Sequence, residues 1–240
     1  MNTPAYKRIL LKLSGEILAG NRGYGIDPDV LSKICNKIIK LKASGLQIGI
    51  VIGGGNIFRG IQAASKGMQR VTGDYLGMLA TIMNAVCVQD ALESLGSVTR
   101  TLSAITVAQI AEPYIRRKSI RHLEKKRVVV FAAGTGNPHM TTDTAASLRA
   151  IEIEAEILLM AKFGVDGVYS EDPKENKSAT KYDTITYQEA LTKKLRVMDS
   201  TALALCMDNN LPIVVFDLFK KGNLKNIILG EKQGTLLSNS

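Results

Sequence analysis

The sequence predicts an α/β protein organised around a mostly parallel β-sheet. Apolar runs of strand length alternate with segments of helical periodicity along the whole chain. Several runs are almost continuous in Val, Ile and Leu, which is typical of parallel strands buried on both faces. The 240 residues are 45% hydrophobic, enough for one large domain or two lobes that share one sheet.

The first predicted unit is a strand, a helix and a second strand. Arg8–Leu13 is rich in Ile and Leu and predicts the opening strand. Asp27 and Pro28 are a favoured N-cap and first helical residue, and the apolar periodicity that follows stops at Gly45. Gln47–Ile52 predicts the next strand, which runs directly into a glycine triplet.

The next elements continue the alternation. Apolar residues from Leu76 onward mark a long helix that ends near Gly96, and the segments 98–102 and 127–131 predict strands. The members of the helical pattern are Leu76, Leu79, Met83, Val86 and Leu92.

The second half repeats this pattern. We expect helices over 142–155 and 197–209 and strands over 157–161 and 213–216. Residues 171–183 are polar and contain Pro173, so a long surface loop is predicted there; its lysines are Lys174, Lys177 and Lys181.

Charge and composition narrow the function classes. The net charge of +9 suits an anionic small ligand or nucleic acid. Much of the excess lies in a basic cluster without interleaved aromatic residues, so we interpret the cluster as a solvated helix face and expect no nucleic-acid partner. The cluster comprises Arg116, Arg117, Lys118, Arg121, Lys125, Lys126 and Arg127.

Membrane and thiol chemistry are not expected. No run reaches the roughly 18 consecutive apolar residues of a membrane span, and residues 1–8 carry no signal-peptide pattern, so a cytoplasmic location is expected. Cys35, Cys87 and Cys206 are scattered and are interpreted as buried small hydrophobes.

Three glycine-bearing loops follow predicted strands, at 13–16, 53–56 and 134–138. Ligands bind beyond the carboxyl ends of the strands in an open parallel sheet. Glycines there let backbone N–H groups approach phosphate oxygens closely. One such loop can be a plain turn, whereas three on one sheet edge indicate a large phosphorylated ligand, or two of them.

The positively charged side chain that a phosphate site needs is not supplied here by either of the common phosphate-binding motifs. Neither the G-x-x-x-x-G-K-[ST] loop nor the G-x-G-x-x-G turn with its distant acid is present. Lys12 lies beside the first glycine loop and Arg59 just after the second. With His122 and His139 as the sole histidines, a nucleophile relay is not expected. Transfer to a phosphate acceptor needs no such relay, because that acceptor is already mostly ionised at neutral pH.

These segments resemble uridylate kinases of the amino-acid kinase superfamily. The matching runs are Lys12–Glu16, Gly53–Gly60, Gly73–Thr81, Ala133–Pro138 and Asp166–Pro173. They are collinear and span nearly the whole chain. The first two runs alone indicate the superfamily, whereas the segments around Arg59, Asp74 and Gly134 point to the UMP branch.

The resemblance implies a three-layer αβα sandwich and a single domain, 1–240. Its phosphate-acceptor half would be roughly 1–155 and its ATP-binding half roughly 156–240. It further implies transfer of the γ-phosphoryl group of ATP to UMP in pyrimidine nucleotide synthesis, with Mg²⁺ and a homohexamer.

The resemblance also implies site residues. The ATP side would comprise Lys12, Leu13, Ser14, Gly15, Gly55, Arg59, Phe163, Tyr169 and Asp172. Phe163 departs from the usual polar residue near the adenine, which leaves backbone or stacking contact there. The UMP side would comprise Gly54, Asp74, Thr135, Gly136, Asn137, Pro138, His139, Met140, Thr141 and Thr142. His139 and Met140 replace a commoner aromatic pair.

Catalysis and regulation follow from the same resemblance. Lys12, Arg59, Asp143 and Asp199 would be catalytic, with the two carboxylates organising Lys12 and the metal, and no metal held by protein side chains alone. UTP is expected to inhibit and GTP to activate weakly. The regulatory residues would be Gly20, Asn21, Arg22, Gly23, Tyr24, Gly25, Arg100 and Arg127, with Gln89 and Glu93 beside them.

Two alternatives remain open from the sequence. One is a kinase of the same superfamily that acts on a carboxylate or carbamate. The other is a nucleotide-sensing regulator that binds DNA through the basic cluster, although the sequence contains no recognised DNA-reading motif.

Overall fold

The computed structural model describes residues 3–60, 65, 67–173, 175–176, 178–195 and 197–239. Lys174 and Lys177 of the predicted surface loop lie outside the described residues. The helices are α1 Gly15–Ala19, the 3₁₀ turn η1 Gly20–Arg22, α2 Pro28–Lys42, α4 Arg70–Ser94, α5 Arg116–Glu124, α6 Thr142–Glu152, α7 Tyr187–Thr192, α8 Ser200–Asp208 and α9 Asn223–Ile228. The strands are β1 Arg8–Leu13, β2 Gln47–Ile52, β3 Thr99–Ser103, β4 Glu112–Pro113, β5 Val128–Ala132, β6 Ile157–Lys162, β7 Val168–Tyr169, β8 Lys181–Tyr182, β9 Thr184–Thr186, β10 Ile213–Asp217 and β11 Thr235–Ser238.

A nine-stranded sheet in the order β4-β3-β5-β2-β1-β6-β10-β11-β9 forms the centre of the molecule. The strands from β4 to β10 are parallel, and β11 pairs antiparallel with β10. Strand β1 lies between β2 and β6, so the strand order reverses beside it, and such a switch point is where open α/β sheets bind ligands.

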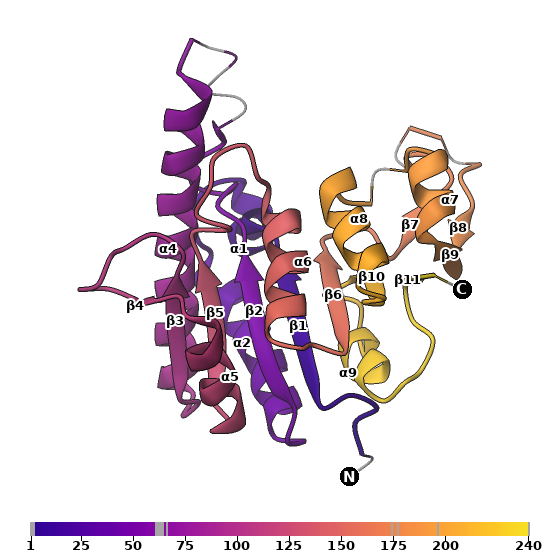
Figure 1. Ribbon diagram of the computed structural model, residues 1–240. Coiled ribbons are helices and arrows are strands. Elements are labelled where there is room, and N and C mark those ends of the chain that lie inside the picture. The colour runs from indigo at the N-terminus through magenta and orange to yellow at the C-terminus, as the bar shows by residue number, and fades with distance from the viewer. Residues whose placement is uncertain are drawn as a thin grey trace.

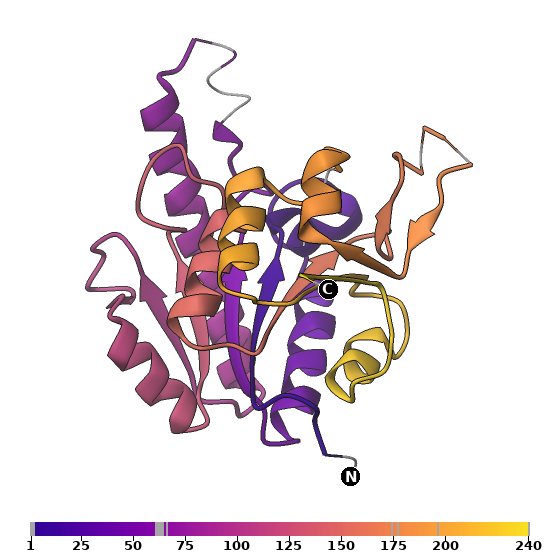
Figure 2. The same cartoon turned by 45° about the vertical axis from the view of Figure 1, so that its right-hand side comes forward.

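Helices cover both faces of this sheet, as Figure 1 shows. Alternate residues of β1 enter two separate cores: Ile9, Leu11 and Leu13 pack with α2, α4 and α9, whereas Leu10 packs with α6 and α8. The expected three-layer αβα sandwich with a mostly parallel sheet is therefore confirmed. The small β7–β8 sheet projects beyond β9 in both views (Figures 1 and 2).

Helix starts follow the capping chemistry of the sequence. The Asp27 carboxylate accepts from the N–H groups of Asp29 and Val30, and Pro28 is the first residue of α2, as predicted. The helix predicted over 197–209 instead begins at Ser200, because Asp199 caps it through the N–H of Ala202. Helix α6 ends at Glu152, three residues before its predicted end, and Glu154 adopts φ 58° just beyond it.

The prediction of an uninterrupted loop over 171–183 is wrong at its end, because Lys181–Tyr182 forms a strand that pairs antiparallel with Val168–Tyr169. The short elements β9, α7, α9 and β11 were not predicted either, since three to six residues give too little periodicity to identify an element.

Helix α4 is the longest described helix and combines a buried with an exposed apolar side. By length and composition it would suit a membrane span, with a mean hydropathy of 1.3 over its most apolar window. A core helix meets the same criteria, and α4 packs on β2, β3 and β5.

The three cysteines differ in burial. Cys87 of α4 is half-buried, whereas Cys35 and Cys206 are fully buried, and burial raises the pKa of both buried thiols to about 11.

Candidate active site

The first two glycine loops touch at the carboxyl edge of the sheet. The N–H of Gly53 donates to the carbonyl of Leu13 at 2.9 Å. A Cβ on Gly15 would lie 2.3 Å from Asn56 Oδ1 and 2.8 Å from the carbonyl oxygen of Gly53. Only glycine therefore allows the loop after β1 to pack against the loop after β2.

Two buried asparagines hold these loops from behind. Asn84 of α4 donates to the carbonyl of Gly53 at 2.7 Å and exchanges amide hydrogen bonds with Asn56. The side-chain amide of Asn56 also donates to the backbone carbonyl of Gly25, and the backbone N–H of Gly25 donates to the backbone carbonyl of Asn56. The segment around Gly25 is thus fixed to the glycine triplet. Sequence reasoning missed Asn84, although an amide within an apolar helix was a usable signal.

A buried ion pair stands beside the loops. Lys12 of β1 places Nζ 2.7 Å from Asp143 Oδ1, in the first turn of α6, with side chains 8% and 19% exposed. Apart from this ionic contact, Asp143 Oδ1 has no hydrogen-bond partner within the described part of the chain. The structure therefore brings two of the predicted catalytic residues together.

Asp199 occupies a different position. Its carboxylate accepts from the hydroxyls of Thr141 at 2.5 Å and Thr144 at 3.0 Å, and no ion pair joins it to Lys12. Thr141 in turn accepts from the N–H groups of Asp143 and Thr144 at the start of α6. Asp199 therefore acts on Asp143 indirectly, by fixing the cap of α6 to the cap of α8. Thr144 is a further residue that the sequence did not reveal.

A cavity of about 470 Å³ opens between the first residues of α4 and the loop after β5. Of the residues predicted for UMP, the lining includes Gly54, Asp74, Thr135, Asn137, Met140, Thr141 and Thr142, whereas Gly136, Pro138 and His139 lie outside it. Gly55 and Arg59, predicted for ATP, also line this cavity. It is called the acceptor cavity below.

Asp74 anchors one wall of the acceptor cavity. Arg70, one turn earlier on α4, places Nε 2.9 Å from both carboxylate oxygens of Asp74. Asp74 Oδ2 also accepts the backbone N–H of His139 at 2.8 Å. The contribution of His139 is therefore made by its backbone, and Arg70 is a lining residue that the sequence reading passed over despite its i, i+4 spacing.

The loop after β5 is held in an unusual backbone shape. Ala133 and His139 have φ of 61° and 66°, a region that non-glycine residues rarely occupy. The Thr81 hydroxyl accepts the N–H of Ala133 at 2.7 Å, and Asp74 accepts that of His139. Both strained residues are thus fixed from α4, as expected where strain shapes a binding loop.

Arg59 lies at the mouth of the acceptor cavity with 44% of its side chain exposed. Its Nη2 lies 2.5 Å from Glu16 Oε1, and its Nε donates to the carbonyl of Gly55 at 3.1 Å. Glu16 follows Gly15 in α1 and was not predicted as a site residue. The guanidinium is therefore positioned between the two glycine loops before any ligand enters.

A second cavity of about 480 Å³ lies beyond the carboxyl end of β6, and Tyr169 and Asp172 line it. The Tyr169 hydroxyl donates to Asp166 at 2.7 Å, which is the main cause that holds the pKa of Asp166 below its ordinary value; Lys220, at 3.3 Å, lowers it further. It is called the adenosine-side cavity below.

The remaining residues predicted for ATP are less directly placed. Phe163 is half exposed and packs edge-to-face on Phe219, with ring centroids 5.5 Å apart, outside the lining. Leu13 is fully buried, so it can offer a ligand only backbone atoms. Ser14 occupies the N-cap position of α1 without a side-chain capping hydrogen bond, and neither Ser14 nor Gly15 lines a cavity.

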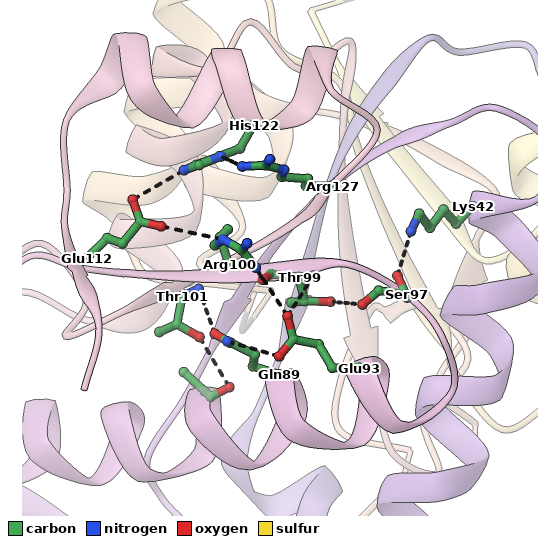
Figure 3. A network of polar contacts seen from close by, with 11 residues as sticks. Lys42, Gln89, Glu93, Ser97, Thr99, Arg100, Thr101, Glu112, His122 and Arg127 are labelled. Atoms are coloured by element: carbon green, nitrogen blue, oxygen red, sulfur yellow. Dashed lines mark hydrogen bonds and ion pairs between the residues drawn. The ribbon is translucent and has the colours of Figure 1, made fainter. Parts of the chain in front are cut away.

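Arg100 and Arg127 belong to the polar network of Figure 3. Arg100 Nη1 lies 3.2 Å from Glu93, and its Nε lies 3.6 Å from Glu112. Arg127 Nη1 lies 3.1 Å from His122 Nδ1, and His122 Nε2 lies 3.3 Å from Glu112. Both arginines thus have intramolecular partners and do not simply face water.

The predicted regulatory residues do not gather within one chain. Gly20–Arg22 forms η1, Arg22 pairs with Asp27 at 3.0 Å, and the segment to Gly25 follows the carboxyl end of β1. Arg100 and Arg127 lie at the amino ends of the parallel strands β3 and β5, whereas the segment 20–25 lies near the carboxyl ends of the strands.

A metal cage of protein side chains is not apparent. Among the residues with described positions, no three His, Cys, Asp or Glu side chains come together in a way that could hold a metal ion. The acidic group beside Lys12 is Asp143, whose Oδ1 contacts the ammonium and has no hydrogen-bond partner among the described residues. Mg²⁺ typically binds one or two carboxylates together with substrate phosphates. The site therefore fits a metal ion that arrives with a nucleotide.

Comparison with solved structures places this architecture among nucleotide kinases. The chain resembles the UMP kinase from Bacillus anthracis with 42% identity and a TM-score of 0.95, over 98% of this chain and 97% of that one. It resembles the UMP kinase from Ureaplasma parvum with 40% identity and a TM-score of 0.91, over 99% and 100%. The uridylate kinase from Archaeoglobus fulgidus matches with 28% identity and a TM-score of 0.74, over 96% and 99%.

The sequence profile of the amino acid kinase family matches residues 7–217, which include the three glycine-bearing loops, the Lys12–Asp143 pair and Asp199. Fold, site geometry and sequence agree over nearly the whole length. The chain belongs to the amino acid kinase family.

Proposed function

We propose that this protein is a UMP kinase, which transfers the γ-phosphoryl group of ATP to UMP and forms UDP and ADP in cytoplasmic pyrimidine nucleotide synthesis. The observation that carries the proposal is the buried Lys12–Asp143 pair at the carboxyl edge of the sheet. Thr142, next to Asp143, lines the acceptor cavity, and the strand paired with that of Lys12 ends at a residue that lines the adenosine-side cavity. The names of the Bacillus and Ureaplasma relatives support it. Residues 1–155 would bind the acceptor and 156–240 most of ATP, within one domain.

The proposed chemistry needs alignment and positive charge rather than a base. The UMP phosphate is already mostly ionised at neutral pH, so it can attack the γ-phosphorus without losing a proton to the protein. The bond from the γ-phosphorus to the bridging oxygen breaks, and its electron pair stays on ADP. The Lys12 ammonium would stabilise the charge of the phosphoryl group in flight, and Asp143 would aim that ammonium.

Arg59 and the metal would complete the charge balance. Arg59 is poised to exchange its contact with Glu16 for a phosphate oxygen, because guanidinium groups bind phosphate bidentately. Mg²⁺ bound with ATP would supply further positive charge near Asp143. Asp199 would act through Thr141 and Thr144 by holding Asp143 in place.

The two cavities divide the recognition. On the UMP side, Asp74 would accept from the ribose, the backbone of 135–142 would follow the uracil and phosphate, and Gly54 would allow close approach. On the ATP side, Tyr169 and Asp172 would hold the adenosine, while Ser14 and Gly15 offer backbone N–H groups to the phosphates.

We also propose the homohexamer, with α4 contributing an interface. Val71, Tyr75, Leu79 and Met83 recur every fourth residue on α4 and are each 43–56% exposed, so they form an uncovered apolar stripe. UTP would inhibit by sharing the uracil and ribose contacts of UMP. GTP would bind between subunits near Arg100 and Arg127 and activate weakly.

The deciding experiment is a coupled assay of ATP consumption with each nucleoside monophosphate and with glutamate, aspartate and acetylglutamate as acceptors. UMP-dependent turnover well above every other acceptor supports the proposal, and preferred turnover of a carboxylate overturns it. The DNA-binding alternative is disfavoured because Arg116, Lys118 and Arg121 of the basic cluster each pair with a glutamate.

A further inference from the structure

Lys162 is a second lysine at the switch point of the sheet, and neither the motifs nor the mechanism above uses it. It is the last residue of β6 and lies opposite Asp217 of β10. Its neighbour Ala161 lies opposite Leu13 of β1. Lys162 therefore emerges at the carboxyl edge next to the loop that begins at Ser14, where an open sheet binds ligands.

The ammonium of Lys162 is withdrawn from solvent without a carboxylate partner. Its Nζ donates to the carbonyl of Val197 at 3.1 Å, and the side chain is half-buried. No carboxylate in the described ranges forms an ion pair with it. Three N–H bonds are available on an ammonium, so at least one can reach another acceptor. A charge held in this way is costly unless an anion joins it.

The electrostatic surroundings connect Lys162 to the reacting centre. Burial lowers the pKa of Lys162, and the positive charge of Lys12 lowers it further, whereas Asp143 and Glu16 raise it. The two lysines therefore repel one another. Lys12 has its carboxylate partner in Asp143, whereas no ion pair in the described part of the chain neutralises Lys162, which leaves its positive charge for an anionic ligand.

Lys162 also lines the adenosine-side cavity together with Tyr169 and Asp172. It thus borders the cavity assigned to the adenosine, while the charge of Lys12 on the paired strand β1 acts on its ammonium. A triphosphate that reached from this cavity to Lys12 would therefore bring its phosphates near Lys162. Negative charge that develops on the departing diphosphate during transfer would fall beside its ammonium.

We propose that the Lys162 ammonium binds the β-phosphate oxygens of ATP and stabilises the ADP leaving group. The inference rests on the proposed phosphoryl transfer. When the bond between the γ-phosphorus and the bridging oxygen breaks, the electron pair remains on the β-phosphate of ADP, and the new bond forms to the UMP phosphate. Lys162 stays protonated throughout and provides charge, not a proton.

The first test is direct binding by calorimetry with ADP, AMP and UMP as probes. Lys162→Met is expected to weaken ADP about ten- to a hundredfold, the equivalent of one charged hydrogen bond, and to leave AMP and UMP unchanged. Lys162→Arg restores charge and should recover most of the ADP affinity. Equal weakening of ADP and AMP, or none of either, overturns the proposal, because a purely structural role through Val197 does not distinguish the β-phosphate.

Lys42→Met is the matched control. Lys42 is also half-buried, burial also lowers its pKa, and its Nζ donates one hydrogen bond, to Ser97 at 2.8 Å. It lies on α2 away from both cavities, so its loss should leave ADP binding unchanged. If Lys42→Met weakens ADP as much as Lys162→Met does, the effect belongs to lysine burial in general and the proposal is wrong.

A measurement on the unaltered protein covers the case in which Lys162→Met does not fold. Acetic anhydride labels lysines, and peptide mass spectrometry reports the labelling of Lys162 alone. ADP should protect Lys162 strongly and AMP should not; equal protection by both overturns the assignment. UMP-dependent ATP consumption by the wild type is measured in parallel. Absence of this turnover would refute the proposed function, whereas turnover without selective protection of Lys162 by ADP would refute only the role proposed for Lys162.

Discussion

Asn56 and Asn84 exchange two side-chain hydrogen bonds, 3.0 and 2.7 Å long, directly behind the glycine loops of the active site. Both side chains are buried, and each bonds a loop carbonyl with its remaining amide hydrogen. One fixed pair thus sets the spacing between the loop after β1, the glycine triplet after β2 and the segment around Gly25.

We expect Asn84→Ala to lower the free energy of unfolding by about 2–4 kcal/mol, since the Gly53 carbonyl and the Asn56 amide lose a buried partner. Urea unfolding measures this loss. Asn36→Ala is the control, because Asn36 is exposed and bonds only within its own helix. Unfolding of Asn84→Ala at the wild-type midpoint would show that the pair does not hold the loops.

Lys12→Ala is expected to reduce kcat about a hundred- to a thousandfold, as the loss of one transition-state stabiliser does, while UMP binding stays close to that of the wild type. Stopped assays and calorimetry with UMP separate the two effects. Lys7→Ala, which removes an exposed lysine just before β1, should change neither. Near-normal turnover of Lys12→Ala would refute the role assigned to Lys12.

Asp74 is expected to make the enzyme prefer UMP over dUMP, because a carboxylate that accepts from a ribose hydroxyl loses its partner in dUMP. Asp74→Asn should therefore bind UMP more weakly and discriminate less. The contact with His139 allows a second explanation, in which Asp74 only shapes the loop. Equal weakening of UMP and dUMP would favour that explanation, and Asp90→Asn on the same helix serves as the control.

The sequence made some of these features predictable and hid others. Lys12, Gly15 and Asp74 lie in contiguous motifs beside predicted strand ends, so their placement at one edge could be expected. Asn84 and Lys162 act through partners 31 and 35 residues away, Gly53 and Val197, and no local pattern reports such contacts. Asp199 was expected to help organise Lys12 and the metal, but its actual contacts depend on how the caps of α6 and α8 meet, which only packing decides.

Stability should fall in acid through Glu112. Burial alone would raise the pKa of Glu112, but hydrogen bonds from Lys118 and His122 outweigh it and hold the pKa below its ordinary 4.5. A depressed pKa means that this stabilisation is complete above pH 4.5 and is lost as the pH falls through the folded-state value. Chemical unfolding should therefore show Glu112→Gln less stable than wild type at pH 7, with the difference shrinking below pH 4.5.

The matched change is Glu124→Gln, because Glu124 pairs with the exposed Arg121 on the same helix. Exposed pairs contribute little, so its unfolding free energy should follow that of the wild type at both pH values. A gap between Glu112→Gln and wild type that stays constant from pH 7 to pH 3 would assign the effect to packing rather than to charge.

Regulation by nucleotides should depend on the Arg100–Glu93 pair. UTP is expected to compete with UMP, so raising UMP at fixed ATP should relieve its inhibition. A GTP triphosphate near Arg100 would have to displace or tolerate Glu93 and Glu112, which repel it, and activation by GTP should therefore be weak.

Glu93→Gln removes one of these negative charges while retaining the shape of the side chain, so it should strengthen activation by GTP; Arg127→Ala should weaken it. Initial rates at fixed ATP and UMP, titrated with GTP, measure both. Asp90→Asn removes an exposed charge from the same helix and should leave the response unchanged, which separates the local contact with Arg100 from the net charge of α4. Strong activation that survives Arg127→Ala, together with an unaltered response in Glu93→Gln, would place the GTP site elsewhere in the molecule.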